Sequence, residues 1–243
     1  MRKGIYLLPN TLTLCGMFCG FYAILSALDG NFVHGAWAIL IAIIFDGLDG
    51  WVARLTHSTT KFGIELDSLS DLVAFGIAPA VLIYSWGLNS FGRIGWGAAF
   101  FYVICGALRL ARFNVQMDTA ESKAFTGMPI PGAAGITACM VLFYTEIWGS
   151  LTGRNYVVLL LPFLLAALMV STFRYHGLKE IDFKRRKPFW LLVAIVAAFV
   201  LVFINPEIVL FVFGIMYMLS GIIEHVKIVK KKERLGTRQN ENS

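Results

Sequence analysis

Long apolar segments occupy most of the 243-residue chain. Each is roughly 17 to 24 residues long, and a helix of about 20 apolar residues crosses the hydrocarbon core of a bilayer. The chain is therefore expected to be an all-α integral membrane protein, a bundle of about eight transmembrane helices. The expected spans are about 5–28, 35–56, 68–87, 94–115, 129–148, 155–173, 188–204 and 207–228.

The charged residues are too few for a soluble domain of this size. Only 15% of the chain is charged, whereas roughly a quarter is typical of soluble domains. The mean hydropathy is +0.71. Because the connections between the apolar segments are short, residues 1–228 are expected to form one transmembrane domain, and residues 229–243 a basic tail.

The positions of the basic residues predict the topology. If the N-terminus is cytoplasmic, all 21 Lys and Arg except Arg93 and Arg154 fall on the cytoplasmic side. This asymmetry follows the positive-inside rule, and an even number of spans then puts both termini in the cytoplasm. The net charge of +6 is thus explained by topology and by attraction to anionic lipid headgroups, so no nucleic-acid partner is expected.

Four aspartates stand at the junction of the second and third expected spans. Asp46 and Asp49 are three residues apart, and Asp67 and Asp71 are four apart. Either spacing puts both carboxylates on one face of a helix. The two helices are antiparallel neighbours, so both pairs lie near the cytoplasmic end and can converge. Each carboxylate inside a membrane segment costs roughly 2.5–3.5 kcal/mol, and bound cations or protonation would remove that cost.

Two divalent cations would balance four carboxylates, and hard oxygen ligands suit Mg²⁺ or Mn²⁺. Such a pair can clamp both sides of a phosphoryl displacement. Gly50 and Ala53 keep one helix face low, Gly63 permits close backbone approach, and Arg54 and Thr60 are candidate phosphate donors. The alternative is that the acids cap helix ends at the membrane surface and face water.

The pattern Asp46-x2-Asp49-Gly50-x2-Ala53-Arg54-x8-Gly63-x3-Asp67-x3-Asp71 resembles the signature of the CDP-alcohol phosphotransferases. That resemblance implies metal ligation by all four aspartates, with Asp71 also deprotonating the acceptor hydroxyl. It also implies a homodimer. The expected contacts to the CDP-lipid are Asn10, Gly50, Ala53, Arg54, Thr60 and Gly63.

Three further segments are similar to the phosphatidylserine synthase branch of that family. They are Leu8-Pro9-Asn10-Thr11-Leu12-Thr13, Ala107-Leu-Arg109-Leu-Ala-Arg112-Phe113-Asn114 and Gly127-Met-Pro129-Ile-Pro131-Gly132. The resemblance implies phosphatidyl transfer from CDP-diacylglycerol to L-serine, which gives phosphatidylserine and CMP. An arginine fork suits a carboxylate, so the expected acceptor contacts are Arg109, Arg112 and Asn114.

Other acceptors and another class of protein stay open at this point. An arginine pair would equally hold the phosphate of glycerol 3-phosphate, and inositol phosphate or choline are further acceptors for the same chemistry. Arg109 and Arg112 could also be ordinary positive-inside flanking charges.

A cation-coupled or proton-coupled transporter is the rival class, since intramembrane acids mark ion pathways. Here, however, the polar groups gather on one side of the membrane and not at its midplane. The protein is therefore expected in the cell (inner) membrane as a multi-pass enzyme with its active site on the cytoplasmic side.

Overall fold

The computed structural model describes residues 7–56, 58, 60–118, 127–149, 153–173 and 203–240, together with positions 196, 200 and 201. None of these residues lies in a β-strand, so the all-α prediction is confirmed for the described chain. The α-helices are α1 Leu7–Leu28, α2 Phe32–Leu55, α3 Lys61–Asp71, α4 Ala78–Trp86, α5 Arg93–Asp118, α6 Ile130–Trp148, α7 Tyr156–Val170 and α9 Pro206–Asn240. A π-helix, η1 (Leu72–Ile77), joins α3 to α4, and a 3₁₀ helix, η2 (Leu88–Phe91), precedes α5.

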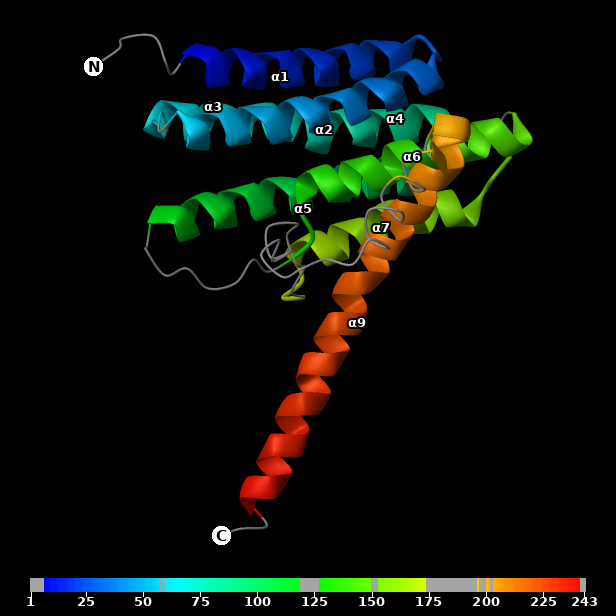
Figure 1. Ribbon diagram of the computed structural model, residues 1–243. Coiled ribbons are helices and arrows are strands. Elements are labelled where there is room, and N and C mark those ends of the chain that lie inside the picture. The colour runs from blue at the N-terminus through cyan, green and yellow to red at the C-terminus, as the bar shows by residue number, and fades with distance from the viewer. Residues whose placement is uncertain are drawn as a thin grey trace.

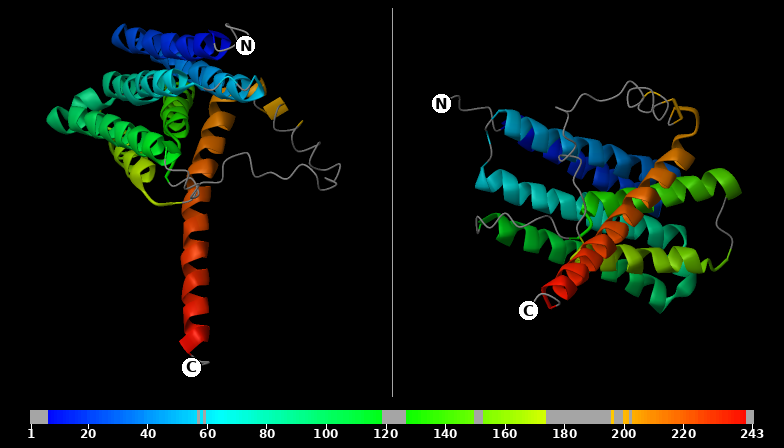
Figure 2. Two further views of the ribbon diagram at one scale, coloured as in Figure 1. Left: turned by 90° about the vertical axis from the view of Figure 1, so that its left-hand side faces the viewer. Right: turned by 60° about the horizontal axis from the view of Figure 1, so that its bottom comes forward.

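The first five α-helices run roughly parallel or antiparallel to one another in a layered bundle (Figure 1). Helix α1 packs on α2 and along α3, η1 and α4, while α5 packs on η1, α4 and α7. Helix α6 contacts both α2 and α9. Helix α9 crosses the bundle at a steep angle and extends well beyond it (Figure 1 and the left view of Figure 2).

Six helical segments in the described part of the chain are long and apolar enough to cross a membrane. They are Leu7–Leu28, Phe32–Leu55, Lys61–Trp86, Arg93–Gln116, Ile130–Trp148 and Pro206–Ile223. The span expected at 155–173 corresponds to α7, whose 15 residues fall short of the roughly 20 that cross a bilayer. The span expected at 188–204 lies almost entirely outside the described residues. The protein is thus a multi-pass membrane protein with six candidate spans in the described chain.

The third span begins earlier than its apolar residues predict. Helix α3 starts at Lys61, ahead of the expected residue 68, because Thr60 caps it: the Gly63 backbone N–H donates to Thr60 Oγ1 at 3.0 Å. Asp67 and Asp71 consequently lie well inside a helix, and their carboxylates point in a fixed direction.

Two glycines let α1 approach both acidic helices. A Cβ on Gly16 would lie 3.6 Å from Phe45 Cβ in α2, and a Cβ on Gly20 would lie 2.5 Å from Ala74 Cα in η1. Small residues in membrane helices permit such close backbone contact. Helix α1 therefore sets the distance between α2, which carries Asp46 and Asp49, and the α3–η1 segment, which carries Asp67 and Asp71.

Replacing Gly20 with alanine is expected to destabilise the fold by roughly 1–3 kcal/mol, since overpacking of this order forces the backbones apart. Gly97 is the matched control, because a Cβ there meets no atom within 4 Å and alanine is the better helix former. Thermal unfolding in detergent compares the two variants. A Gly20→Ala midpoint at or above that of Gly97→Ala would contradict the close α1–η1 contact.

Candidate metal centre

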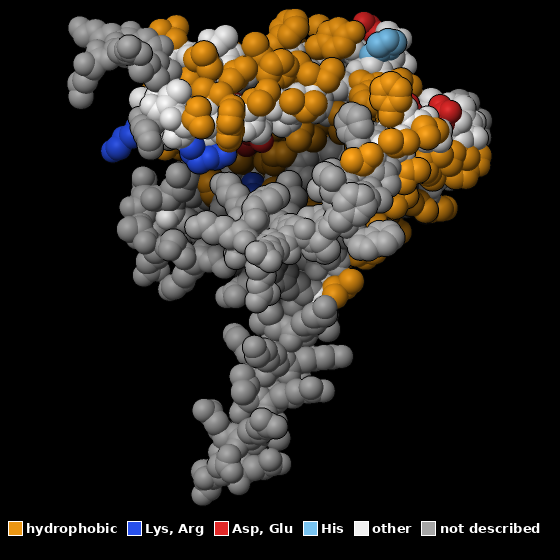
Figure 3. Space-filling model, in the orientation of Figure 1, with side chains coloured by type: hydrophobic (Ala, Val, Ile, Leu, Met, Phe, Trp, Pro, Cys, Tyr) orange, Lys and Arg blue, Asp and Glu red, His pale blue; other side chains and the backbone are white. Residues whose placement is uncertain are grey.

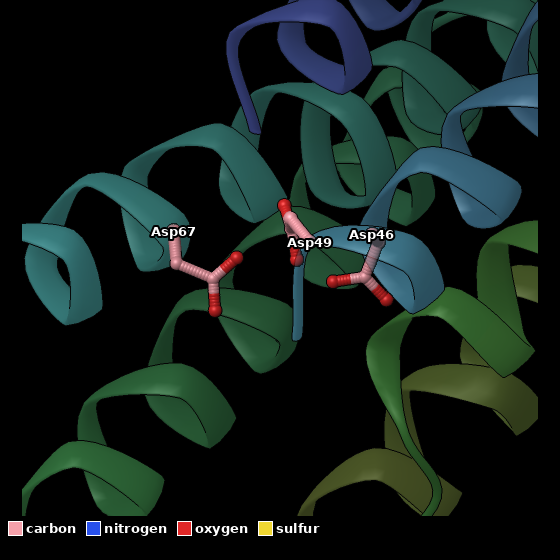
Figure 4. A group of neighbouring side chains, drawn as sticks. All are labelled: Asp46, Asp49 and Asp67. Atoms are coloured by element: carbon pink, nitrogen blue, oxygen red, sulfur yellow. The ribbon is translucent and has the colours of Figure 1, made fainter. Parts of the chain in front are cut away.

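Three carboxylates from two helices meet at one point. Asp46 and Asp49 of α2 and Asp67 of α3 each offer an oxygen atom, and these three oxygens lie within 4.8 Å of one another. Figure 4 shows the three side chains directed toward the space between the two helices. The helical spacings of the sequence thus bring these groups together.

Asp71 lines the same cavity one turn further along the chain. The walls of this cavity are Thr13, Gly16, Ala42, Asp46, Asp49, Asp67, Ser70, Asp71, Ala74 and Phe75. Asp71 is the last residue of α3 and adjoins the Asp46 carboxyl. In the space-filling view, acidic atoms are recessed below the apolar surface of α1 and α2, and a basic atom lies deeper in the same recess (Figure 3).

Hydroxyl groups orient the aspartates from the side of α1. Thr13 Oγ1 donates to Asp49 Oδ2 at 2.8 Å, and Ser70 Oγ donates to the Thr13 backbone oxygen at 3.0 Å. Both bonds are buried, so they fix Asp49 and tie α1 to α3. The sequence pattern did not single out Thr13 or Ser70 as residues of the site. The available signal for Thr13 was its spacing from Gly16 and Gly20, which places it on the packed face of α1.

The side chains around this cavity fit a divalent cation. Arg54 interacts electrostatically with Asp49, and Arg109 with Asp71 and Asp46, which leaves the four carboxylates in excess of these two cations. Uncompensated carboxylates at membrane depth are costly. A set of carboxylate oxygens is the ligand type that Mg²⁺ and Mn²⁺ prefer.

The π-helix beside the aspartates is held by α5. The Tyr102 hydroxyl donates to the Phe75 backbone oxygen at 3.1 Å, and Tyr102 is 2% exposed. Because Phe75 lines the aspartate cavity, this bond connects the cavity wall to the helix that carries Arg109. Single-turn π-helical segments are frequent at functional sites.

Three residues expected to contact the CDP-lipid gather where α1 and α3 begin. A Cβ on Gly63 would lie 3.2 Å from Thr60 Oγ1 and 3.3 Å from Asn10 Oδ1. The bare Gly63 backbone is therefore flanked by two polar side chains, one of which caps α3. A side chain at residue 63 would crowd both of these oxygen atoms, so glycine permits their close approach to the backbone.

The other expected lipid contacts lie at the end of α2. The exposed Arg54 folds back over Gly50, and its Nη1 would be 3.4 Å from a Cβ there. Ala53 is half-buried next to it. The guanidinium of Arg54 is thus held over the face of α2 that carries Asp46 and Asp49, and it remains open to solvent.

Arg109 and Arg112 of α5 face different partners. Arg109 is 8% exposed, lies near Asp71 and Asp46, and its Nε has no hydrogen-bond partner among the described residues. Arg112 donates through Nη1 to Val170 O at 3.3 Å and through Nη2 to Met169 O at 3.4 Å. Arg109 therefore lies near the aspartates, whereas two donor atoms of Arg112 are bonded to carbonyls at the end of α7.

Asn114 lies beside the aspartate helix and not in the cavity wall. Its Nδ2 donates to Ser68 Oγ at 3.0 Å, and Ser68 Oγ donates back to Asn114 Oδ1 at 3.1 Å. Ser68 follows Asp67 directly, so this pair joins α5 to α3 next to a carboxylate of the cluster. Ser68 is a third polar residue, after Thr13 and Ser70, that the sequence pattern did not single out.

Comparisons with known proteins give the chemistry of similar chains. The family model described as CDP-alcohol phosphatidyltransferase matches residues 6–173. A CDP-diacylglycerol–serine O-phosphatidyltransferase of Helicobacter pylori is 41% identical over 229 residues, which are 93% of this chain and 94% of the relative. An archaetidylserine synthase of Methanothermobacter thermautotrophicus is 43% identical over 58% of this chain and 60% of its own. The match to the family model contains every residue of the cavity walls and of the expected lipid and acceptor contacts, and it ends before α9.

Proposed function

The chain belongs to the CDP-alcohol phosphatidyltransferase family, and we propose that it transfers the phosphatidyl group of CDP-diacylglycerol to L-serine, giving phosphatidylserine and CMP. The observation that carries the proposal is the meeting of Asp46, Asp49 and Asp67 within 4.8 Å, next to Asp71. Serine is the acceptor named for the relative that matches 93% of this chain. The protein is thus a transferase of phospholipid synthesis.

We further propose that Asp46, Asp49, Asp67 and Asp71 hold two divalent cations, Mg²⁺ or Mn²⁺. When bound, such ions neutralise charge on the attacked phosphate and on the departing CMP. The oxygen-only side chains of this cluster support that choice of ion. Thr13, bonded to Asp49 at 2.8 Å, keeps one carboxylate in the orientation that ligation requires.

The donor lipid would lie across the ends of α1, α2 and α3. Its acyl chains remain in the bilayer while its pyrophosphate approaches Gly63, where a Cβ would meet Thr60 and Asn10 at 3.2 and 3.3 Å. The guanidinium of Arg54 can donate two parallel hydrogen bonds to a phosphate. Gly50 and Ala53, which have small side chains or none, leave the face of α2 beneath the Arg54 guanidinium unobstructed.

Asp71 is proposed as the general base. It accepts the proton of the serine hydroxyl as that oxygen attacks the phosphorus bearing the diacylglycerol. The phosphorus–oxygen bond to CMP breaks, and its electron pair leaves with CMP. No covalent intermediate on the protein is required. Asp71 lines the same cavity as the other three aspartates and lies within electrostatic range of Arg109, which supports this role.

Arg109 is the acceptor contact that the geometry supports most directly, because it is buried beside Asp71 with an unused donor. Arg112 and Asn114 are proposed to complete that side of the site. Asn114 would act from its bonded position on Ser68, where it also holds α5 against α3.

The membrane arrangement is part of the same proposal. Both termini and the active site lie on the cytoplasmic side of the cell (inner) membrane, because the basic residues concentrate there. Two further spans beyond the six candidates complete a bundle of eight. The protein works as a homodimer, as the resemblance to its family implies.

The reaction can be tested with purified protein in detergent, Mn²⁺ or Mg²⁺, CDP-diacylglycerol and labelled L-serine. Serine is expected to release CMP roughly 100-fold or more above the rate with glycerol 3-phosphate or choline, since a site built for one polar acceptor strongly rejects others. Label should appear in phosphatidylserine. CMP release that requires glycerol 3-phosphate and ignores serine would refute the acceptor assignment.

A further inference from the structure

Helix α9 packs onto the first turns of α6 through a face that carries Tyr217. Gly214, Tyr217, Met218 and Gly221 share this face by helical spacing, and Met218 is 7% exposed. A Cβ on Gly214 would lie 3.0 Å from Ile136 Cγ1 in α6. A Cβ on Gly132, also in α6, would lie 3.2 Å from Tyr217 Cε1. The Tyr217 ring therefore packs directly on the backbone of Gly132, where a larger side chain would crowd it.

From this position Tyr217 approaches Arg109 of α5, which lies near the aspartate cavity. It interacts electrostatically with the Arg109 guanidinium, and Arg109 interacts in turn with Asp71 and Asp46. Tyr217 is half-buried, and its phenol is both a donor and an acceptor of hydrogen bonds. Helix α9 thus brings a polar group within electrostatic range of Arg109, although its own sequence is largely apolar around that position.

The buried Arg109 indicates what kind of ligand belongs there. Its Nε is buried with no hydrogen-bond partner among the described residues. An unsatisfied donor on a buried cation is unfavourable, and an anion that accepts from it removes the penalty. Serine carries its carboxylate on the carbon next to the one that bears its hydroxyl. An anion site adjoining Asp71 is therefore the arrangement that presents this hydroxyl to the base.

We infer that Tyr217 is a specificity-determining residue of the acceptor site, whose hydroxyl donates, together with the Arg109 guanidinium, to the carboxylate of a hydroxy amino acid. This inference rests on the proposed function. Arg112 donates through Nη1 and Nη2 to the carbonyls of Val170 and Met169, and Tyr217 of α9 would add a donor beside Arg109.

The position of Tyr217 in the chain supports a role in choosing the acceptor. The match to the family model ends at residue 173, before α9 begins at Pro206. The donor chemistry that the family shares is thus contained in the matched segment. A residue outside that segment is well placed to distinguish one alcohol from another, and a carboxylate from the phosphate of glycerol 3-phosphate.

The test is Tyr217→Phe, which removes the hydroxyl and keeps the ring that packs on Gly132. The KM for L-serine is expected to rise roughly ten-fold or more, as for a lost hydrogen bond to a charged group, while the KM for CDP-diacylglycerol stays within about two-fold. L-Serinamide, which lacks the carboxylate, is the second probe. Its inhibition constant against serine should not change, so the preference for serine over serinamide falls by the same factor.

Tyr144→Phe is the matched control, because Tyr144 of α6 packs edge-on against Trp86 and in a tilted contact with Trp148 and does not line the aspartate cavity. Its kinetic constants should equal those of the wild type. Tyr217→His, which keeps a ring and a donor, should give an intermediate KM for serine and covers the case in which the phenylalanine variant does not fold.

Three outcomes would overturn the inference. They are an unchanged KM for serine, equal rises in the KM for serine and in the inhibition constant of serinamide, and equal rises in the KM for serine and for CDP-diacylglycerol. A histidine variant no better than phenylalanine would also count against it. Wild-type protein that releases no CMP with serine would instead refute the proposed function. The two failures are therefore distinguishable.

Discussion

Replacing Asp71 with asparagine is expected to lower serine-dependent CMP release by about 10³-fold or more. A positioned general base contributes roughly 10²–10⁴-fold, and asparagine also withdraws one charged ligand from the aspartate cavity. Asparagine has nearly the same shape, so the walls formed by Ala74 and Phe75 should be undisturbed. The measurement is the steady-state rate of CMP release at saturating CDP-diacylglycerol and serine.

Asp29→Asn is the control for this variant. Asp29 is exposed in the turn between α1 and α2, at the ends of these helices that lie away from the aspartate cavity. It should keep the wild-type rate. Both variants should unfold at nearly the wild-type temperature in detergent. A rate for Asp71→Asn within ten-fold of the wild type would exclude Asp71 as the base.

Removal of divalent cations is expected to reduce CMP release to background, and Mn²⁺ or Mg²⁺ should restore it. The physical reason is the excess of carboxylates: three of their oxygens lie within 4.8 Å in a segment where charge is expensive. A ligand that binds only the folded state also stabilises it, by about 2.7 kcal/mol at a concentration 100 times its Kd. Thermal unfolding with and without Mn²⁺ therefore gives a readout independent of catalysis.

The control for cation removal is Asp67→Asn. This variant loses one member of the three-oxygen group, so its unfolding temperature should respond less to added Mn²⁺ than that of the wild type. Glu146 is an acidic residue of α6 outside the cavity walls, and Glu146→Gln should respond like the wild type. Catalysis that survives complete chelation would sink the proposed metal chemistry.

The membrane helices could be read from apolar length because burial in lipid demands that length. The exceptions have local causes. Helix α3 begins in a polar stretch, and only the cap at Thr60 explains its early start. The π-helical turn at Leu72–Ile77 was invisible because it depends on tertiary contacts, including the bond from Tyr102 to the Phe75 carbonyl. Helix α7 is shorter than the expected span 155–173, because it ends at Val170 and Ser171 is no longer helical.

The aspartate cluster was predictable because spacing on a helix fixes which side chains share a face. The supporting residues were not. Thr13 and Ser70 are ordinary small polar residues of α1 and α3. The sequence does not indicate that Ser70 bonds to the Thr13 backbone and so joins these two helices. The sequence likewise treats Arg109 and Arg112 as equivalent, and only the fold directs one to the aspartates and the other to the carbonyls of α7. The importance of Tyr217 could be seen only from the structure, where its ring packs on Gly132.

The carboxylates and the hydroxyls bonded to them all come from the stretch between Thr13 and Asp71. These contacts involve α1, α2 and α3 alone and are separated by at most 57 residues of the chain, so they need no later helix. The aspartate cluster of α2 and α3, with its support from α1, can be assembled while the remaining helices are still being synthesised. Later helices are then free to diverge toward a different alcohol without dismantling it, which is a route by which one ancestral catalyst diversifies into several lipid headgroup enzymes.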